Sequence, residues 1–476
     1  MANLQGIIKS IRDTMREDKG VNGDAQRIEQ LGWMLFLKIF DDKDQEMEML
    51  DDAYASPIPT LFQWRNWAAD AEGITGDALL DFIDRQLFPA LRQLPTTLGA
   101  GGATNPRALL VREVFEGNNN YMKSGTNLRK VCNKLNEIDF NVAAERHLFG
   151  DLYETILREL QSAGDSGEFY TPRAVTQFMT DIIAPRLGEV VYDPACGTGG
   201  FLTAAIEHLK QQARTVADRQ LIGLNVRGTE YKPLPYVLAL TNLILHDVEV
   251  PNLRYDDSLA REYTSIRDRD RVDVILANPP FGGTVANGNE GNFPANFRTR
   301  ESADLFLVLI VNLLRQGGRA ALVLPDGSLT GEGVKARVRE KLLTDCNLHT
   351  IVRLPQSVFA PYATVNTNLL FFEKGKPTTE VWYYEHQLPE DYKAYSKTKP
   401  IKIQEFDVEK AWWTNRVEND FSWRITIDQI KQKGFDLDFK NPHRKAPEIN
   451  HNRADIMAMM KQNHLRISQL LADLDV

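Results

Sequence analysis

Residues 189–202 read EVVYDPACGTGGFL, in which two apolar runs are separated by glycines. The first run predicts a strand that ends at Asp193, and the last predicts a helix from about Gly200 to Ala213. The glycines between them predict a tight turn in which backbone N–H groups at a helix start are open to a ligand. A plain strand-to-helix turn is the alternative reading.

The spacing of these glycines departs from two common nucleotide loops. A dinucleotide site has the pattern G-x-G-x-x-G, and a phosphate loop continues with Gly-Lys-Ser/Thr; neither stands here. The carboxylate of Asp193 ahead of the glycines suits a ligand with a cationic amino group better than a pyrophosphate. Cys196, inside the loop, is expected to be a small packed residue rather than a nucleophile.

Strand and helix patterns alternate over about 200 residues, which predicts an α/β fold with a mostly parallel, doubly wound sheet. Further strands are predicted at residues 221–226, 272–277, 319–324, 348–354 and 367–372. Helices are predicted at residues 173–183, 235–246, 304–314 and 335–343.

A second motif, Asn278-Pro279-Pro280-Phe281, follows the strand at residues 272–277. The prolines cannot continue a ladder, so the strand must end there. Ligands of open α/β sheets bind at the carboxyl ends of strands. The amide oxygen of Asn278 and a rigidly held carbonyl offer two acceptors to a primary amine, which keeps electron density on its nitrogen. The ring of Phe281 could stack on a flat heterocycle, although Asn-Pro-Pro is also a common loop punctuator.

Acidic residues follow two other predicted strands. Glu230 stands 230 − 193 = 37 residues after Asp193, and an acid at the end of a second strand is placed to bind ribose hydroxyls. Asp256 and Asp257 end a third strand. A helix N-cap is the alternative role for these acids.

Two loops flank the motifs. Phe169 and Tyr170 fit either a hydrophobic staple or an apolar wall beside a cofactor, and the residues alone do not decide. Thr171 is a predicted N-cap, with Pro172 at the first helical position. Residues 282–292 are rich in glycine and asparagine, which predicts a mobile loop over the site that does not pack.

The ends of the chain carry no catalytic cluster. Residues 1–160 read as a helical packing or docking domain ahead of a catalytic domain at 161–380. Residues 381–445, with several tryptophans, read as an appendage to it. Residues 446–476 predict a C-terminal helix whose apolar stripe includes Ile467, Leu470, Leu471 and Leu474. That helix either covers the protein's own core or docks on another chain.

Composition limits the class of protein. No apolar run has membrane-spanning length, and the start lacks the shape of a signal peptide. Cys132, Cys196 and Cys346 have no metal-ligand spacing, so no metal site and a reduced, cytoplasmic location are expected. The net charge of −9 is unusual for a protein that binds nucleic acid unaided. If this chain acts on nucleic acid, we therefore expect a partner that contributes binding affinity.

Together the motifs resemble the modification (methyltransferase) subunit of type I restriction-modification systems, within the amino-group DNA methyltransferases. The resemblance runs nearly end to end, and includes Gly434-Phe435-Asp436-Leu437 and Asn441-Pro442 near the tail. It implies a Rossmann-like, S-adenosylmethionine-dependent domain between a helical N-terminal domain and a C-terminal helical tail. The implied reaction is methyl transfer from S-adenosylmethionine to the exocyclic amine of adenine in double-stranded DNA.

The resemblance also implies roles for individual residues. Asn278, Pro279, Pro280 and Phe281 are the implied catalytic residues. Asp193 and the glycine backbone match the loop near the methionine moiety, Glu230 the acid on the ribose, and Asp257 the acid beside the adenine of the cofactor. The implied cofactor-binding set is Phe169, Tyr170, Thr171, Pro172, Asp193, Ala195, Gly197, Thr198, Gly199, Gly200, Phe201, Glu230, Asp257 and Asn278. One departure is Asn225-Val226-Arg227, which interrupts the expected apolar strand before Glu230.

The implied partners are DNA, a separate specificity subunit, a second copy of the modification subunit and a restriction (motor) subunit, with no membrane. Two other readings stay open. Protein glutamine methyltransferases share Asn-Pro-Pro with an aromatic next, usually Tyr where this chain has Phe281. The other reading is a non-catalytic, structural subunit that has kept the pocket. The intact acids and Asn278 argue against this reading.

Overall fold

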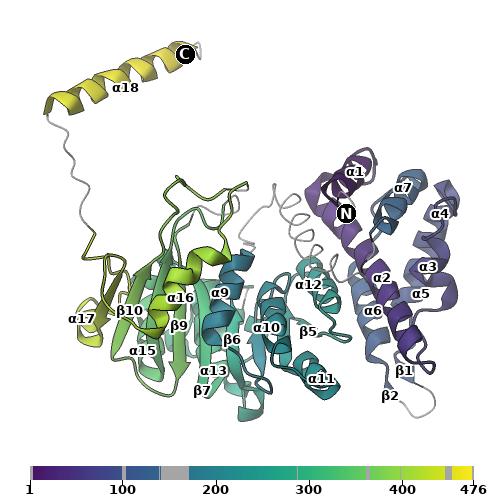
Figure 1. Ribbon diagram of the computed structural model, residues 1–476, viewed down its shortest axis with the longest axis horizontal. Helices are drawn as coiled ribbons and strands as arrows, with labels where there is room; N and C mark the ends of the chain where they lie inside the picture. The colour runs from purple at the N-terminus through teal and green to yellow at the C-terminus, as the bar shows by residue number, and fades with distance from the viewer. Residues whose placement is uncertain are drawn as a thin grey trace.

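The computed structural model describes residues 4–98, 103–138, 140, 171–286, 288–360, 365–396, 398–444 and 453–473. In Figure 1 a bundle of N-terminal helices lies beside a large sheet with helices on its faces, and the last helix stands apart from both. The predicted α/β class with a leading helical part is confirmed. Among the described residues, no helix combines the length and hydrophobicity needed to cross a membrane.

The N-terminal part is built from amphipathic helices around an aromatic core. Trp33, Phe36 and Phe40 of the long helix α2 are fully buried, because residues three or four apart share one face of a helix. The helices are α1 Leu4–Arg16, α2 Gly23–Leu50, α3 Trp64–Trp67, α4 Gly76–Phe82, α5 Phe88–Arg92, α6 Pro106–Gly117 and α7 Gly125–Asn136. Strands β1 Thr97–Leu98 and β2 Ala103–Thr104 form a small hairpin.

The central sheet has nine strands among the described residues, in the order β11-β10-β8-β9-β7-β6-β3-β4-β5. Strands β5, β4, β3, β6 and β7 are parallel neighbours, and β9 is antiparallel to β7 and β8. Their bounds are β3 Val191–Asp193, β4 Val226–Glu230, β5 Asn252–Tyr255, β6 Val272–Ala277, β7 Leu314–Pro325, β8 Cys346–Leu354, β9 Thr367–Lys374, β10 Glu380–Glu385 and β11 Ser422–Thr426.

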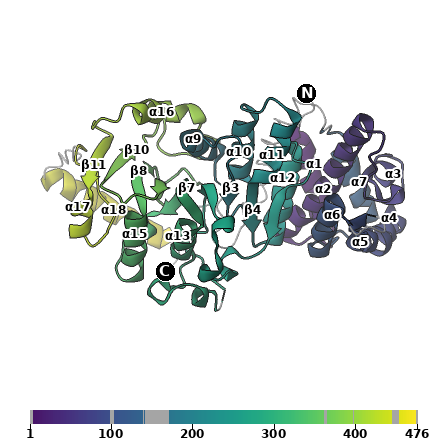
Figure 2. The ribbon, with the colours of Figure 1, turned by 90° about the horizontal axis from the view of Figure 1, so that it is seen from below.

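Helices cover both faces of this sheet. Figure 2 shows α9 Arg173–Ile183, α10 Gly200–Lys210 and α16 Asp407–Thr414 on one face, and α13 Ser302–Leu313 and α15 Val334–Asp345 on the other. Alternate residues of β6 belong to the two cores on opposite faces of the sheet. Val274 and Leu276 lie in the core under α9 and α10, and Ile275 and Ala277 lie in the core under α13 and α15. Burial on both faces is typical of parallel strands and explains the continuous apolar run. The remaining helices are α11 Val216–Asn225, α12 Pro233–Leu245, α14 Asp326–Leu329, α17 Ile427–Gln432 and α18 Arg453–Asp473.

The order of the strands creates a switch point. From β3 the chain passes to β4 and β5 on one side, and then returns to place β6 and β7 on the other. At such a point the two neighbouring connections leave the sheet in opposite directions, which opens a crevice at the carboxyl ends of the strands. The ends of β3 and β6 are Asp193 and Ala277, so the two sequence motifs meet at this crevice.

Helix α12 joins the helical part to the sheet. It packs against α2, with Leu238 and Leu240 in the N-terminal core, while Ala239 and Leu243 belong to the core under α10. Asn242 of the same helix donates to the carbonyl of Thr198 in the glycine loop at 3.0 Å. The packing of the N-terminal helices therefore reaches the site through one rigid element.

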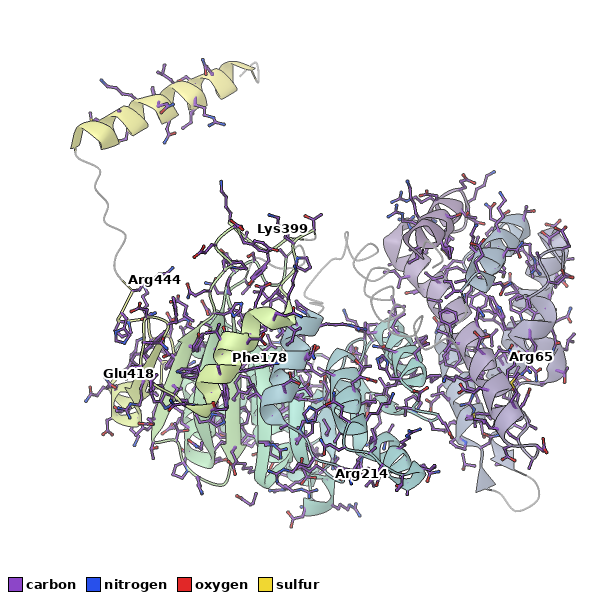
Figure 3. The ribbon with its side chains drawn as sticks, viewed as in Figure 1. Arg65, Phe178, Arg214, Lys399, Glu418 and Arg444 are labelled. Atoms are coloured by element: carbon purple, nitrogen blue, oxygen red, sulfur yellow. The ribbon has the colours of Figure 1, made fainter. Side chains whose placement is uncertain are left out.

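Three predictions about elements are wrong. Residues 221–225 belong to α11, and the second strand is β4, Val226–Glu230. Helix α9 begins at Arg173 with Pro172, not Thr171, at its N-cap position. Residues 381–445 were expected to form an appendage, but β10 and β11 continue the central sheet. The packing there is aromatic: Phe178 of α9, labelled in Figure 3, stacks on Phe406 with 4.2 Å between ring centroids.

Helix α18 does not cover the chain's own core in its described residues. Met457, Met460, Leu465 and Ile467 are each at least 50% exposed. The side chains of Leu470, Leu471 and Leu474 lie outside the described residues.

The junction between the helical part and the sheet yields a stability prediction. Arg107 is buried, pairs with the fully buried Asp44 and donates to the carbonyl of Glu249 at 3.0 Å. Arg107→Met leaves the Asp44 carboxylate without its cation, and we expect a loss of about 3–5 kcal/mol in the free energy of unfolding, measured by urea titration. Arg112→Met on the same helix is the matched control. Arg112 forms an exposed pair with Glu116, so that loss should stay below about 1 kcal/mol. Equal losses in the two variants would contradict the assignment.

Candidate active site

A cavity of about 440 Å³ lies at the carboxyl ends of β3, β4, β5 and β6. Its wall combines carboxylates, glycine-loop backbone and apolar side chains, which is the composition of a site for a polar organic ligand. The residues that line it are Thr171, Thr176, Asp193, Pro194, Ala195, Cys196, Gly197, Thr198, Gly200, Phe201, Glu230, Tyr231, Lys232, Pro235, Asp256, Asp257, Ser258, Leu259, Asn278, Pro280, Phe281, Gly283, Thr284, Val285, Ala286, Ser302 and Phe306.

The turn after β3 wraps around the Asp193 carboxylate. Asp193 is 1% exposed, and its Oδ1 accepts from the Ala195 N–H at 3.0 Å. Gly197 has a φ of 54° and Gly199 one of 81°, a left-handed region in which glycine carries no steric cost. Gly199 also lies close to α12, because a Cβ there would stand 3.0 Å from Leu243 Cδ1. Gly197 and Gly199 therefore allow the backbone turn, and Gly199 also allows the loop to pack closely against α12.

Glu230 ends β4 and its carboxylate is held by backbone groups. Oε2 accepts from the Gly197 N–H and Oε1 from the Lys232 N–H, each at 2.8 Å. The glycine loop and the second strand are thereby tied together. A carboxylate whose orientation is fixed in this way presents its remaining lone pairs to the cavity in one direction.

Asp257 follows β5, where it caps a short helix and also lines the cavity. Its Oδ1 accepts from the Leu259 N–H at 2.9 Å, so it caps the short helix Ser258–Ala260. Its Oδ2 accepts from the Asn289 side chain at 2.7 Å, and the residue lines the cavity. The preceding residue, Asp256, lines the same wall.

The Asn278-Pro279-Pro280-Phe281 motif follows β6, on one side of β3, whereas Glu230 and Asp257 lie at the ends of the strands on the other side of β3. The Nδ2 of Asn278 donates to Thr171 Oγ1 at 2.9 Å. The Ser302 hydroxyl donates to the Pro280 carbonyl at 3.1 Å. The Phe281 ring meets Phe359 edge to face, with centroids 6.2 Å apart. The strand tip is thus supported by three elements that are distant in sequence.

The loop at residues 282–292 was expected not to pack, and for its described residues this is wrong. Val285 and the adjoining Phe293 are buried, and residues 289–292 form a short 3₁₀ helix. Asn292 donates to the carbonyls of Leu259 and Ala260. The loop does lie at the site, since residues 283–286 line the cavity.

The N-6 DNA Methylase family model matches residues 144–451, and the HsdM N-terminal domain model matches residues 4–135. The methylase subunit of the type I restriction enzyme EcoEI from Escherichia coli is 51% identical, over 98% of this chain and 96% of that protein. The chain belongs to the type I restriction enzyme methylase subunits.

Solved structures agree with this assignment. A chain described as the modification subunit of a type I restriction enzyme from Vibrio vulnificus YJ016 superimposes with a TM-score of 0.84 and is 44% identical, over 93% of this chain and 97% of that one. A chain from work on complex assembly and conformational transition of the type I R-M system gives a TM-score of 0.80 at 34% identity, over 100% of this chain and 98% of that one. The predicted fold and family are confirmed.

The cavity of this methylase subunit brings together most of the residues named from the sequence. Pro172, Gly199 and Pro279 are not among its lining residues, and Pro279 is buried. Phe169 and Tyr170 lie outside the described residues. The role of each lining residue stays a prediction.

Several lining residues were missed by sequence reasoning. Tyr231 and Lys232 adjoin Glu230, so their place in the chain was the available signal. Ser302 gave no signal, because its hydroxyl reaches the Pro280 carbonyl across 22 residues of chain. Thr171 was named both as a cap and in the implied cofactor-binding set, but its contact with Asn278 was not predicted.

Burial changes the acidity of two carboxyl groups in the methylase cavity. Loss of hydration on burial raises the pKa of Asp193 to about 8, with a smaller contribution from the charge of Glu230 and an opposing one from the Ala195 N–H. Burial likewise raises the pKa of Glu230. Raised carboxyl pKa values in a cavity are typical of functional sites.

The pKa of Asp193 gives a pH-dependent stability prediction. A raised carboxyl pKa contributes stability at low pH that is lost as pH rises, because the unfolded chain ionises from about pH 4 whereas the folded one must hold a proton up to about pH 8. In Asp193→Asn this penalty is absent. The gain in unfolding free energy over the native protein should therefore grow by roughly 1.4 kcal/mol per pH unit between pH 6 and 8, in urea titrations without ligand. Asp268→Asn, whose side chain is fully exposed, is the control. A gain that is constant with pH would contradict the prediction.

Proposed function

We propose that the cavity at the ends of β3, β4, β5 and β6 binds S-adenosylmethionine, and that Asn278 presents the exocyclic amine of a DNA adenine to its methyl group. Membership of the N-6 DNA methylases gives the reaction class. The observation that carries the assignment of the site is the meeting of Asp193 and Asn278 at the switch point of the sheet, inside one cavity.

The residues present fit this cofactor. The Asp193 carboxylate suits an ammonium group, and the fixed Glu230 carboxylate suits two neighbouring hydroxyls. Asp257, with its preceding residue, stands at the third strand end, where the adenine base of the cofactor would lie. When bound, S-adenosylmethionine supplies an electrophilic methyl carbon on a sulfonium.

Asn278 and the Pro279 carbonyl act on the target amine. Accepting its two hydrogens would keep the nitrogen lone pair available for the methyl carbon that bound S-adenosylmethionine would supply; the electrons of the carbon–sulfur bond would stay on sulfur, and the surplus proton of the amine would pass to solvent. The amine is paired in duplex DNA, so the base must be flipped out at a cost of roughly a few kcal/mol. Stacking on Phe281 would offset about 1–3 kcal/mol of this. Alignment of the reacting atoms supplies most of the catalysis.

Partners supply what this chain lacks. The net charge of −9 disfavours unaided binding of DNA, so we propose that a separate specificity subunit reads the site. The assembly would include DNA, a second copy of the modification subunit and, for restriction, a motor subunit, in the cytoplasm. The relative solved in the context of type I R-M complex assembly supports this arrangement.

The catalytic assignment is tested with Asn278→Ala. We expect methyl transfer to DNA adenine to fall by roughly 100-fold or more, the scale for loss of one preorganised polar group at a reacting centre. Binding of S-adenosylmethionine, measured by calorimetry, should change little. Radiolabelled methyl transfer by the assembled complex is the readout.

Asn225→Ala is the matched control. The Asn225 side chain donates to the Gly188 carbonyl at the opposite end of the sheet, so transfer should be retained. Native-like transfer by Asn278→Ala would refute the catalytic assignment and would leave the structural-subunit reading standing.

The exposed C-terminal helix gives a test of assembly. Met457, Met460, Leu465 and Ile467 of α18 are exposed and need a partner surface, so we expect deletion of residues 450–476 to abolish co-purification with the specificity subunit. Cofactor binding should persist, because the cavity lies in the sheet. Unchanged assembly after the deletion would exclude α18 as the docking element.

A further inference from the structure

The side-chain amide of Asn278 is anchored by Thr171, 107 residues earlier in the chain. Nδ2 donates to the Thr171 hydroxyl oxygen at 2.9 Å, in a partly buried position where both residues line the cavity. We propose that Thr171 is a positioning residue that orients the Asn278 amide for catalysis. The inference rests on the proposed function of Asn278.

The orientation of the amide matters because its two ends have opposite hydrogen-bonding character. The oxygen accepts and the NH₂ group donates. With Nδ2 held by Thr171, the oxygen lies on the other branch of the amide, where it can accept from the target amine. A half-turn of the amide would set NH₂ against NH₂, which opposes two donors and withdraws the acceptor that activates the nitrogen.

The local structure holds Thr171 in place. A residue before proline is restricted to extended backbone, and Pro172 follows directly. The Pro172 carbonyl accepts from the Val175 and Thr176 N–H groups, which fixes the start of α9. Because Pro172 occupies the N-cap position, the Thr171 hydroxyl is not used to cap the helix and turns to Asn278 instead. The β-branch of threonine narrows its rotamers further.

A second contact pins the same motif from the opposite side. Ser302, at the start of α13, donates to the Pro280 carbonyl. Helices α9 and α13 lie on opposite faces of the sheet (Figure 2), so the strand tip is held from both layers. Thr171 differs from Ser302 in that it contacts the side chain proposed to touch the substrate, which gives it a catalytic consequence.

The test compares Thr171→Val with Thr171→Ser in the complex assembled with its specificity subunit. Valine keeps the shape but removes the acceptor, whereas serine keeps the hydroxyl. At saturating S-adenosylmethionine and DNA, we expect kcat of Thr171→Val to fall roughly 10- to 100-fold, the factor for loss of a partly buried hydrogen bond at the reacting centre. Thr171→Ser should recover most of the rate. The Kd for S-adenosylmethionine, measured by calorimetry, should stay within about 3-fold of the native value in both variants.

A variant cycle separates positioning from a structural effect. In the Asn278→Ala background, Thr171→Val should cost little further rate, because residues that act as one unit are not additive. A fall in cofactor affinity with unchanged kcat would overturn the proposal and make Thr171 a cofactor contact. Equal rates for the native protein and Thr171→Val would also overturn it. If the native complex transfers no methyl group to adenine, the proposed function itself fails and this inference with it.

Discussion

The parallel pairing of β3 with β6 is the constraint on which the site depends. Val191 is in register with Val274 and Tyr192 with Ile275, so the two strands end side by side. Asp193 is the last residue of one strand, and Asn278 is the first residue after the other. The prolines after Asn278 lack the N–H groups that would extend the ladder, so the Asn278 amide lies at the carboxyl end of β6. If β3 and β6 paired in another register, Asp193 and Asn278 would lie farther apart.

The site carries an electrostatic cost that the rest of the fold must offset. Asp193 and Glu230 are both buried, and burial raises the pKa of each. Backbone N–H groups hold both carboxyl groups. Such groups lower a carboxyl pKa, but burial outweighs them here, so a cationic or hydroxyl-bearing ligand would favour the ionised form of both acids. The two apolar cores on either side of the sheet provide the stability that permits this arrangement.

Local patterns predicted the elements that end at the cavity better than some of the elements around them. The bounds of α9 and the ends of β3 and β6 follow from apolar runs stopped by glycine or proline. Residues 221–225 misled because their leucines and isoleucine resemble a strand, while the capping box of Thr215 and Asp218 commits them to α11. β10 pairs with β8 across a long stretch of chain, which no local pattern reveals.

Composition also misjudged the asparagine-rich loop. Residues 282–292 were expected to form a mobile loop that does not pack, but Asn289 and Asn292 each donate to a residue that follows β5. A list of residue types does not distinguish a polar side chain in water from one that is bonded within the protein. Long-range partners such as Thr171 for Asn278 are missed for the same reason: the hydroxyl satisfies a local cap rule and a distant amide equally well, and only the fold chooses between them.

The charge of the chain and the exposure of α18 point to the same division of labour. A helix of 21 residues whose described side chains are exposed gains little from tertiary packing, and isolated helices are marginal in water. An acidic enzyme that acts on DNA meets electrostatic repulsion at every approach to its substrate. Under the proposed function, association would relieve both difficulties, because a partner that covers the helix would also contribute the basic surface that binds the duplex. The catalytic chain would then need only to shape a pocket for one base and one cofactor.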